Sequence, residues 1–249
     1  MWENTKPIPH KFQILGFIAQ QGVVTIEDIN RHFYPDRDNA KAIRVTLYEM
    51  GVAHLRYYSP NVKNGVWYID KQDLYDLVGI WFPELCYFKV RAPVIHLVPH
   101  SLELNRIRTV LEQYSGMNVV KWCSESFIRS LPDSDWRDDF STPKIPDALF
   151  WHKRQDKTER KFFLEYERTL KSVDRYREIF DAYGERQDVE NESVIYICHT
   201  KEMRKKLSYI AERRRVDDHF QFVSLERLYE KYPIKKTVKE EKVLEVQQA

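Results

Sequence analysis

Residues 146–184 read PDALFWHKRQDKTERKFFLEYERTLKSVDRYREIFDAYG. Two apolar runs with a charged stretch between them predict a strand from Asp147 to Trp151, a turn, and a strand from Phe162 to Glu167. Helical spacing then predicts a helix from about Leu170 to Tyr183, which Gly184 ends. A hairpin followed by a helix is typical of a mixed sheet that helices cover.

Two glutamates on the second predicted strand carry the chemistry of this segment. Side chains alternate between the faces of a strand, so Glu165 and Glu167 project together while Tyr166 projects the other way. If the first strand starts at Asp147, its carboxylate meets the two glutamates at the sheet edge. Such carboxylates repel one another unless a divalent cation binds them, and oxygen ligands suit Mg²⁺ or Mn²⁺. The pattern therefore predicts a metal site at Asp147, Glu165 and Glu167.

Two basic residues extend this candidate site. Lys171 lies four residues beyond Glu167, just inside the predicted helix, where it can steady an attacking water or a phosphate. Arg175 either clamps a phosphate with two hydrogen bonds or pairs with Glu178 or Asp181. A simpler interpretation competes with the site, because charges on an exposed strand face often serve solubility alone. The order of acids and lysine, on strands that are otherwise apolar, favours a functional site.

The rest of the second half continues the alternation of strands and helices. The predicted elements are helix Leu102–Tyr114, strand Asn118–Trp122, helix Ser124–Leu131, strand Ser193–His199, helix Met203–Arg213, strand Phe220–Val223 and helix Leu225–Lys231. Residues 83–99 are expected to form a connector, residues 132–143 a loop, and the tail beyond Pro233 a mobile segment. The fold class predicted for the whole chain is α+β, with a mixed α/β sheet flanked by helices.

The first part of the chain predicts a separate unit. Its predicted elements are helix Lys11–Gln20, a helix that Thr25 caps and Pro35 ends, a helix from Asp38 or Asn39 to Met50, strands Val52–Tyr58 and Val66–Ile69, and a helix from Lys71 to about Val78. The turn between the strands ends in Asn-Gly, which favours a hairpin. Three helices followed by a hairpin predict a winged helix-turn-helix.

Basic and polar side chains of this unit are candidates for contact with DNA. Lys41 and Arg44 on the third helix can reach base edges or phosphates, while Arg56, Lys63 and Asn64 on the wing can hold the backbone or enter the minor groove. Winged helices also serve as protein-interaction modules, so this alternative stays open. A second basic concentration comprises Lys201, Arg204, Lys205, Lys206 and Arg213 to Arg215. It can line the catalytic cleft, or it can be a solvated helix face.

Length and composition agree with an ordered protein of two domains and a tail. The chain has 249 residues, 43% of them hydrophobic, and a formal net charge of +2. We expect domains at residues 1–82 and 83–233 and a charged tail at 234–249. Three scattered cysteines predict neither a disulfide framework nor a zinc knuckle, which fits a reducing cytoplasm. No apolar run predicts a signal peptide or membrane insertion.

The order of these motifs resembles known nucleases. Pro146-Asp147, a hairpin, Glu165-Tyr166-Glu167 and a helix resemble the PD-(D/E)xK fold of restriction endonucleases, in the variant where Glu replaces the usual Lys. With a preceding winged helix, IPDALFWHK and FFLEYERTLKSVDRYREIFDAY are similar to the replication-relaxation proteins of plasmids, especially the mobilization relaxases of the MOBC class. The likeness covers nearly the whole chain before the tail.

This resemblance implies a metal-dependent DNA endonuclease, a relaxase that nicks one strand at a plasmid origin of transfer to start conjugative mobilization. Asp147, Glu165, Glu167 and Lys171 match the proposed acidic and lysine set of that family. The implied partners are double-stranded plasmid DNA, accessory mobilization proteins of the relaxosome, and coupling proteins. Other relaxases use a histidine triad, but His96 and His100 have the wrong spacing for it.

Several alternatives stay open at this point. Tyr166 or Tyr176 can be imagined as a covalent nucleophile, although packing in the core explains both and water is the favoured nucleophile. The chain can also be a non-catalytic DNA-binding regulator or relaxosome accessory protein that keeps a nuclease-like fold. A third alternative is a hydrolytic nuclease of defence or repair.

Overall fold

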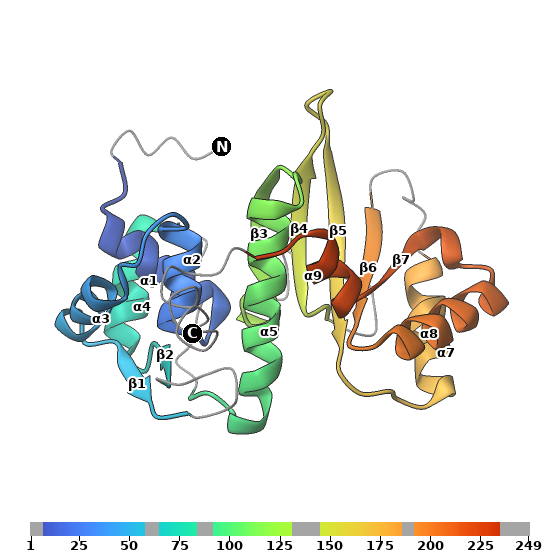
Figure 1. Ribbon diagram of the computed structural model, residues 1–249, viewed down its shortest axis with the longest axis horizontal. Coiled ribbons are helices and arrows are strands. Elements are labelled where there is room, and N and C mark those ends of the chain that lie inside the picture. Colours follow the sequence, from blue (N-terminus) through green and yellow to red (C-terminus); the bar gives the residue numbers. More distant parts are fainter. Residues whose placement is uncertain (1–6, 58–64, 84–91, 131–144, 186–191, 235–249) are drawn as a thin grey trace, which may run out of the picture. The chain divides into compact units, whose positions relative to one another are not determined.

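The computed structural model describes residues 7–57, 65–83, 92–130, 145–185 and 192–234. It is a mixed α and β protein (Figure 1) that divides into two compact units, one ending at Arg106 and one spanning Ile107–Ile234. The domain boundaries expected at residues 82 and 233 stay predictions. None of the described helices is both long and apolar enough to cross a membrane.

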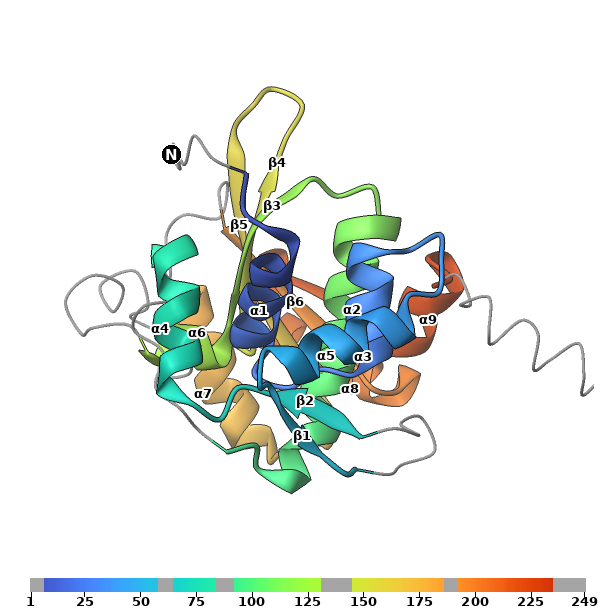
Figure 2. The same cartoon turned by 90° about the vertical axis from the view of Figure 1, so that its left-hand side faces the viewer.

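The first unit contains the helices and the hairpin that the sequence predicts, in the predicted order (Figure 2). Its elements are α1 (His10–Gln21), α2 (Ile26–Phe33), α3 (Ala40–Glu49), β1 (Ala53–Leu55), β2 (Val66–Tyr68) and α4 (Gln72–Trp81). Strands β1 and β2 pair antiparallel, with Ala53 opposite Tyr68. The turn between them includes residues 58–64, which lie outside the described residues. The assignment as a winged helix therefore stays a prediction.

A capping box explains where α2 begins, and a glycine explains where α3 ends. The hydroxyl of Thr25 accepts the N–H of Asp28 at 3.0 Å, and the carboxylate of Asp28 accepts the N–H of Thr25 at 2.9 Å. This reciprocal capping box starts α2 where the sequence predicts it. Gly51 follows α3 with a φ of +70°, a left-handed conformation that glycine adopts without steric penalty.

Helix α5 (Val98–Thr109) begins earlier than the sequence predicts. A short 3₁₀ segment, η2 (Ile95–Leu97), leads directly into it. The prediction of a connector up to Pro99 is wrong at this end, because a proline in the first turn of a helix interrupts no hydrogen bond. After Thr109 the helix continues as a π-helical segment, η3 (Val110–Tyr114).

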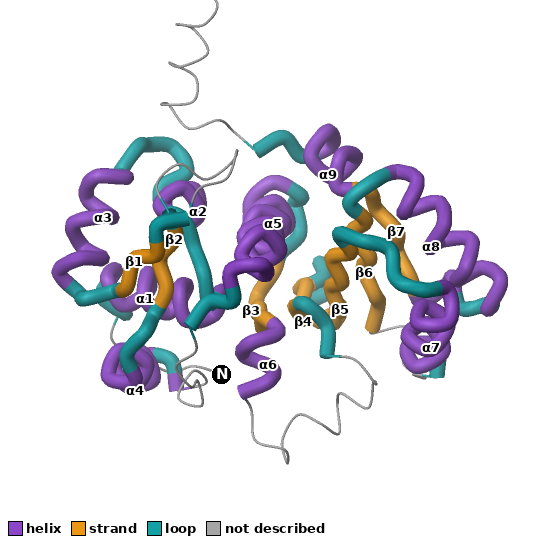
Figure 3. The backbone as a smooth tube through the Cα atoms, turned by 90° about the horizontal axis from the view of Figure 1, so that it is seen from below, coloured by secondary structure: helices purple, strands orange, loops and turns teal. Residues whose placement is uncertain are grey.

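The second unit is built on a five-stranded mixed sheet in the order β3-β4-β5-β6-β7. Its elements are β3 (Val119–Ser124), α6 (Glu125–Ser130), β4 (Ala148–Lys153), β5 (Glu159–Glu167), α7 (Val173–Gly184), β6 (Glu192–Cys198), α8 (Lys201–Arg214), η4 (Asp217–His219), β7 (Phe220–Ser224) and α9 (Leu225–Lys231). Strand β4 is antiparallel to β3 and β5, whereas β5, β6 and β7 run parallel. Figure 3 shows α7 and α8 side by side next to the parallel strands. The predicted mixed sheet with flanking helices is confirmed.

Aromatic rings fill both faces of this sheet. On one face Phe150 stacks between Trp122 and Phe162, with ring centroids 5.6 and 5.0 Å apart. On the other face Phe180 of α7 packs against Phe220 of β7 at 4.8 Å. Helix α7 therefore covers the face to which the odd-numbered residues of β5 project.

Three predicted boundaries shift at the candidate site. Strand β4 starts at Ala148, so Asp147 lies one residue before it, and β5 starts at Glu159 instead of Phe162. Helix α7 starts at Val173 because the hydroxyl of Ser172 accepts the N–H of Arg175 and caps the helix there. Lys171 therefore lies in the loop before α7, and the prediction that it stands inside the helix is wrong.

Replacing Thr25 by alanine should lower the free energy of unfolding of the first unit by about 1 kcal/mol, because the buried capping box loses its hydroxyl. Urea unfolding followed by helical circular dichroism measures the change. Thr25→Ser keeps the hydroxyl and should lose less. An alanine variant with the denaturation midpoint of the wild type would contradict this role of Thr25.

Candidate active site

The three predicted carboxylates gather where β4 begins and β5 ends. Ala148 pairs with Leu164, so Asp147 continues this register to the position opposite Glu165. Glu165 and Glu167 follow on the same face of β5, as the alternation predicts. All three residues are buried, with exposed fractions of 8% for Asp147, 1% for Glu165 and 5% for Glu167. The carboxylates therefore lie within the protein rather than along an open sheet edge.

Each carboxylate has a partner within the protein. Asp147 Oδ2 accepts the backbone N–H of Tyr166 at 2.7 Å, and Glu165 Oε1 accepts the hydroxyl of Tyr183 at 3.0 Å. Glu167 Oε2 forms an ion pair with Lys171 Nζ. Such partners offset the loss of hydration that a buried carboxylate suffers. The acids are thus held in place before any ligand binds.

Tyr176, Tyr196 and Cys198 lie near the glutamates, and their surroundings favour the protonated form of each side chain. Burial is the main cause that raises the pKa of Tyr176 and Tyr196, and it raises the pKa of Cys198 to about 12 with the nearby Glu167 adding to the shift. The hydroxyl of Tyr176 also accepts the N–H of Lys171 at 3.0 Å. A phenolate or thiolate is therefore disfavoured here at neutral pH, which supports water over Tyr176 as the nucleophile.

The hydroxyl of Tyr196 is an exception to this pattern of satisfied polar groups. Tyr196 is fully buried and pairs in register with Glu165, yet its hydroxyl has no hydrogen-bond partner in the described part of the chain. Leaving such a group without a partner costs about 1–3 kcal/mol, so buried hydroxyls usually bind a protein group, a water or an ion. The Tyr196 hydroxyl can therefore donate a hydrogen bond to an additional partner or accept one from it.

The residues of the site fit a divalent cation in chemistry, although not in their present contacts. Three carboxylates provide the oxygen ligands that Mg²⁺ and Mn²⁺ prefer, and Tyr196, whose hydroxyl has no partner among the described residues, is the sheet neighbour of Glu165. Across the described ranges, however, no group of three or more His, Cys, Asp or Glu side chains is arranged to hold a metal ion. To hold a cation, the side chains of Asp147, Glu165 and Glu167 would have to come closer together than they are in this structure.

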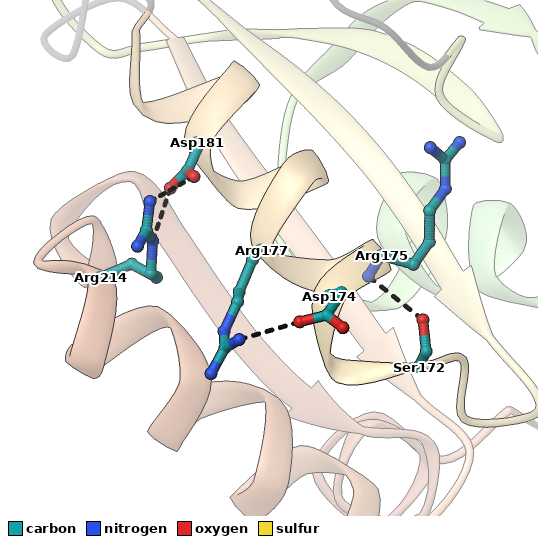
Figure 4. Close-up of polar contacts among 6 residues, drawn as sticks. All are labelled: Ser172, Asp174, Arg175, Arg177, Asp181 and Arg214. Carbon is teal, nitrogen blue, oxygen red and sulfur yellow. Dashed lines mark hydrogen bonds and ion pairs between the residues drawn. The ribbon is translucent and has the colours of Figure 1, made fainter.

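The two basic residues predicted near the site differ in position. Lys171 is 38% exposed and contacts Glu167, so it connects the buried acids to the protein surface. Arg175 donates through Nη1 to Glu178 at 2.8 Å on the exposed side of α7. In Figure 4 its guanidinium points away from Asp174 and Arg177. For Arg175 the structure shows the ion-pair alternative and not a position beside the carboxylates.

Two residues near the site, His199 and Tyr183, were not identified from the sequence. The hydroxyl of Tyr166 lies 3.1 Å from His199 Nδ1, and the backbone N–H of His199 donates to the backbone carbonyl of Glu167 at 3.0 Å. His199 follows β6 at the carboxyl end of the parallel strands, which is the usual location of functional side chains in such sheets. The position of His199 at the end of a predicted strand could have indicated a functional role from the sequence. Tyr183 gave no such indication, because its contact with Glu165 depends on how α7 packs.

The DNA-contact candidates of the predicted winged helix lie in the first unit. Lys41 and Arg44 are exposed on α3, together with Tyr48, which is 60% exposed. Arg56 is exposed directly after β1. These three basic side chains form no ion pair with another described residue. Lys63 and Asn64 lie outside the described residues, so their predicted roles stay predictions.

Comparison with protein-family models, with curated proteins and with solved structures finds no match to this chain. Any functional assignment therefore depends on the chemistry of the site and on the motifs of the sequence.

The contact between Tyr183 and Glu165 can be measured by a double-mutant cycle. Tyr183→Phe should lower the free energy of unfolding by about 1–3 kcal/mol, because a buried carboxylate loses a donor. Combined with Glu165→Gln, the loss should differ from the sum of the two single losses. Chemical denaturation measures all three variants, and Tyr232→Phe serves as the control. Strict additivity would show that the two side chains do not interact.

Proposed function

We propose that the chain is a metal-dependent DNA endonuclease that nicks one strand, with Asp147, Glu165 and Glu167 as the ligands of Mg²⁺ or Mn²⁺. The observation that supports it is the burial of three carboxylates around one end of β4 and β5. Apolar residues in place of buried charges are often neutral or stabilising, so a group of buried acids points to a role in function. Lys171 adds the cation that phosphate chemistry needs.

The surroundings of each side chain indicate its role in the proposed reaction. A divalent cation bound to the carboxylates would polarise the phosphodiester and neutralise the charge that develops on it. The Tyr166 N–H orients Asp147, and the Tyr183 hydroxyl orients Glu165. Lys171 is partly exposed, so it contacts the phosphate or positions the attacking water from the open side.

The substrate follows from the first unit and from the sequence motifs. Exposed Lys41 and Arg44 on α3, with Arg56 after β1, suit a winged helix that binds duplex DNA. The likeness of the motifs to MOBC relaxases makes the origin of transfer of a plasmid the proposed target. Relaxosome accessory proteins and coupling proteins are then the proposed partners.

A second candidate function is a non-catalytic DNA-binding protein that retains a nuclease-like fold. The observation in its favour is that Asp147, Glu165 and Glu167 each already have a protein partner. Acids satisfied in this way can serve the structure alone. Sequence-specific binding without cleavage in the presence of any divalent cation would support this candidate.

Asp147→Ala and Glu165→Ala should each lower nicking of supercoiled origin plasmid with Mg²⁺ or Mn²⁺ by at least about 100-fold, because metal catalysis contributes several kcal/mol. Gel separation of nicked and supercoiled plasmid measures the rate. Asp174→Asn removes an exposed carboxylate of the same unit and should cut at the wild-type rate. If both alanine variants cut at the wild-type rate, the centre is assigned wrongly.

Lys41→Ala and Arg44→Ala should weaken duplex binding, and each should reduce the slope of log affinity against log salt by about 1 if it contacts a phosphate. Fluorescence anisotropy across a salt series measures both quantities. Lys11→Ala, a cationic residue of α1, is the control in the same unit. An unchanged affinity and slope in both α3 variants would remove α3 from the DNA surface.

A further inference from the structure

The outer face of α8 carries cations on both sides of an exposed tyrosine. The helix, KEMRKKLSYIAERR, has six Lys or Arg residues and two Glu residues. Lys205, Tyr209 and Arg213 are spaced by four residues and therefore share one face. Tyr209 is 54% exposed, which is unusual for so large an aromatic side chain. The face is thus basic and aromatic at once.

The ring of Tyr209 is held in place by its neighbour on the helix. Arg213 Nε donates to the Tyr209 hydroxyl at 2.9 Å, and the guanidinium carbon lies 5.4 Å from the centre of the ring. A cation over an aromatic ring fixes the orientation of the ring. The protein therefore presents a flat apolar surface to solvent with a positive charge beside it.

Two of the cations on α8 form ion pairs with neighbouring helices. Lys201 pairs with Glu226 at 3.0 Å, and Arg214 pairs with Asp181 of α7, which joins the two helices (Figure 4). Lys205 and Lys206, in contrast, are exposed and form no ion pair with another described residue. Their charges serve no contact within the described fold.

Arg215 adds a second, independent observation. It ends α8 with φ 58° and ψ 39°, the left-handed conformation in which glycine is the usual residue. A residue with a Cβ has a modest conformational cost at this position compared with glycine. Arg215 therefore adds a further cation directly after Arg213 and Arg214 at the end of the helix.

We infer that the outer face of α8 binds single-stranded DNA, with Tyr209 stacking on a base and Lys205, Lys206, Arg213 and Arg215 contacting phosphates. Lys205 and Arg213 are eight residues apart, about 12 Å along a helix, so together they can contact more than one phosphate of a strand. Bases stacked inside a duplex do not offer their faces to a side chain, whereas a single strand does. An exposed aromatic ring between cations therefore fits the single strand.

The role of this surface in the cell rests on the proposed nicking function. Helix α8 begins three residues after Cys198, the partner of Glu167 in the sheet, so it starts at the end of the sheet where the carboxylates lie. A nick frees a strand end, and a stacking surface on α8 would hold that strand. The binding itself requires neither metal nor cleavage.

Binding of a fluorescein-labelled oligothymidine to the full chain in EDTA tests the inference by anisotropy. Tyr209→Ala should weaken binding by about tenfold or more, whereas Tyr209→Phe should stay within about threefold of wild type because it keeps the stacking ring. Lys205→Ala combined with Lys206→Ala should weaken binding and lower its salt dependence. Arg177→Ala removes a cation that already pairs with Asp174 and is the matched control.

Arg215→Gly separates function from stability in the same assay. It should raise the melting temperature, since glycine relieves the left-handed strain, and it should weaken binding of the oligothymidine. A wild-type chain that does not bind, a Tyr209→Ala variant that binds as wild type, or equal competition by a duplex would overturn the inference. If nicking fails while Tyr209→Ala still weakens binding, the proposed endonuclease falls and the single-strand surface stands.

Discussion

Strand β5 pairs antiparallel with β4 on one side and parallel with β6 on the other, and its alternation determines what each face of the sheet contains. Phe162 and Leu164 project to one face, whereas Phe163, Glu165 and Glu167 project to the other. A shift of one residue in register would exchange every one of these side chains between the faces. The pairing that buries the aromatic core therefore also decides where the acids lie.

The acids share their face with the most tightly buried part of the protein. Glu165 lies in a region that includes the fully buried rings of Phe163, Tyr183 and Tyr196. Well-packed apolar residues in place of buried charges are often neutral or stabilising, so these acids are not explained by stability. The donors that hold them include a backbone N–H for Asp147, a tyrosine hydroxyl for Glu165 and a lysine for Glu167. The site is consequently ordered by the fold.

Periodicity in the sequence was enough to predict the order of strands and helices, the shared face of Glu165 and Glu167, and the capping box at Thr25. It could not predict the burial of Asp147, because the bond to the Tyr166 N–H forms only once β4 and β5 are in register. The early start of α5 was missed because a proline usually signals a break, although it fits a first turn. Contacts between a helix and a sheet leave no periodic trace in the sequence.

Helix α5 has a consequence for how the chain folds during synthesis. Val98 and Leu102 pack with Val23 and Val66 in one core cluster, and Asn105 Nδ2 donates to the carbonyl of Val23 at 2.8 Å across 82 positions of the chain. The three helices and the hairpin are complete long before these residues are made. On the ribosome the first unit therefore stays short of its core until α5 has emerged, and its apolar surface stays open to chaperones during that delay.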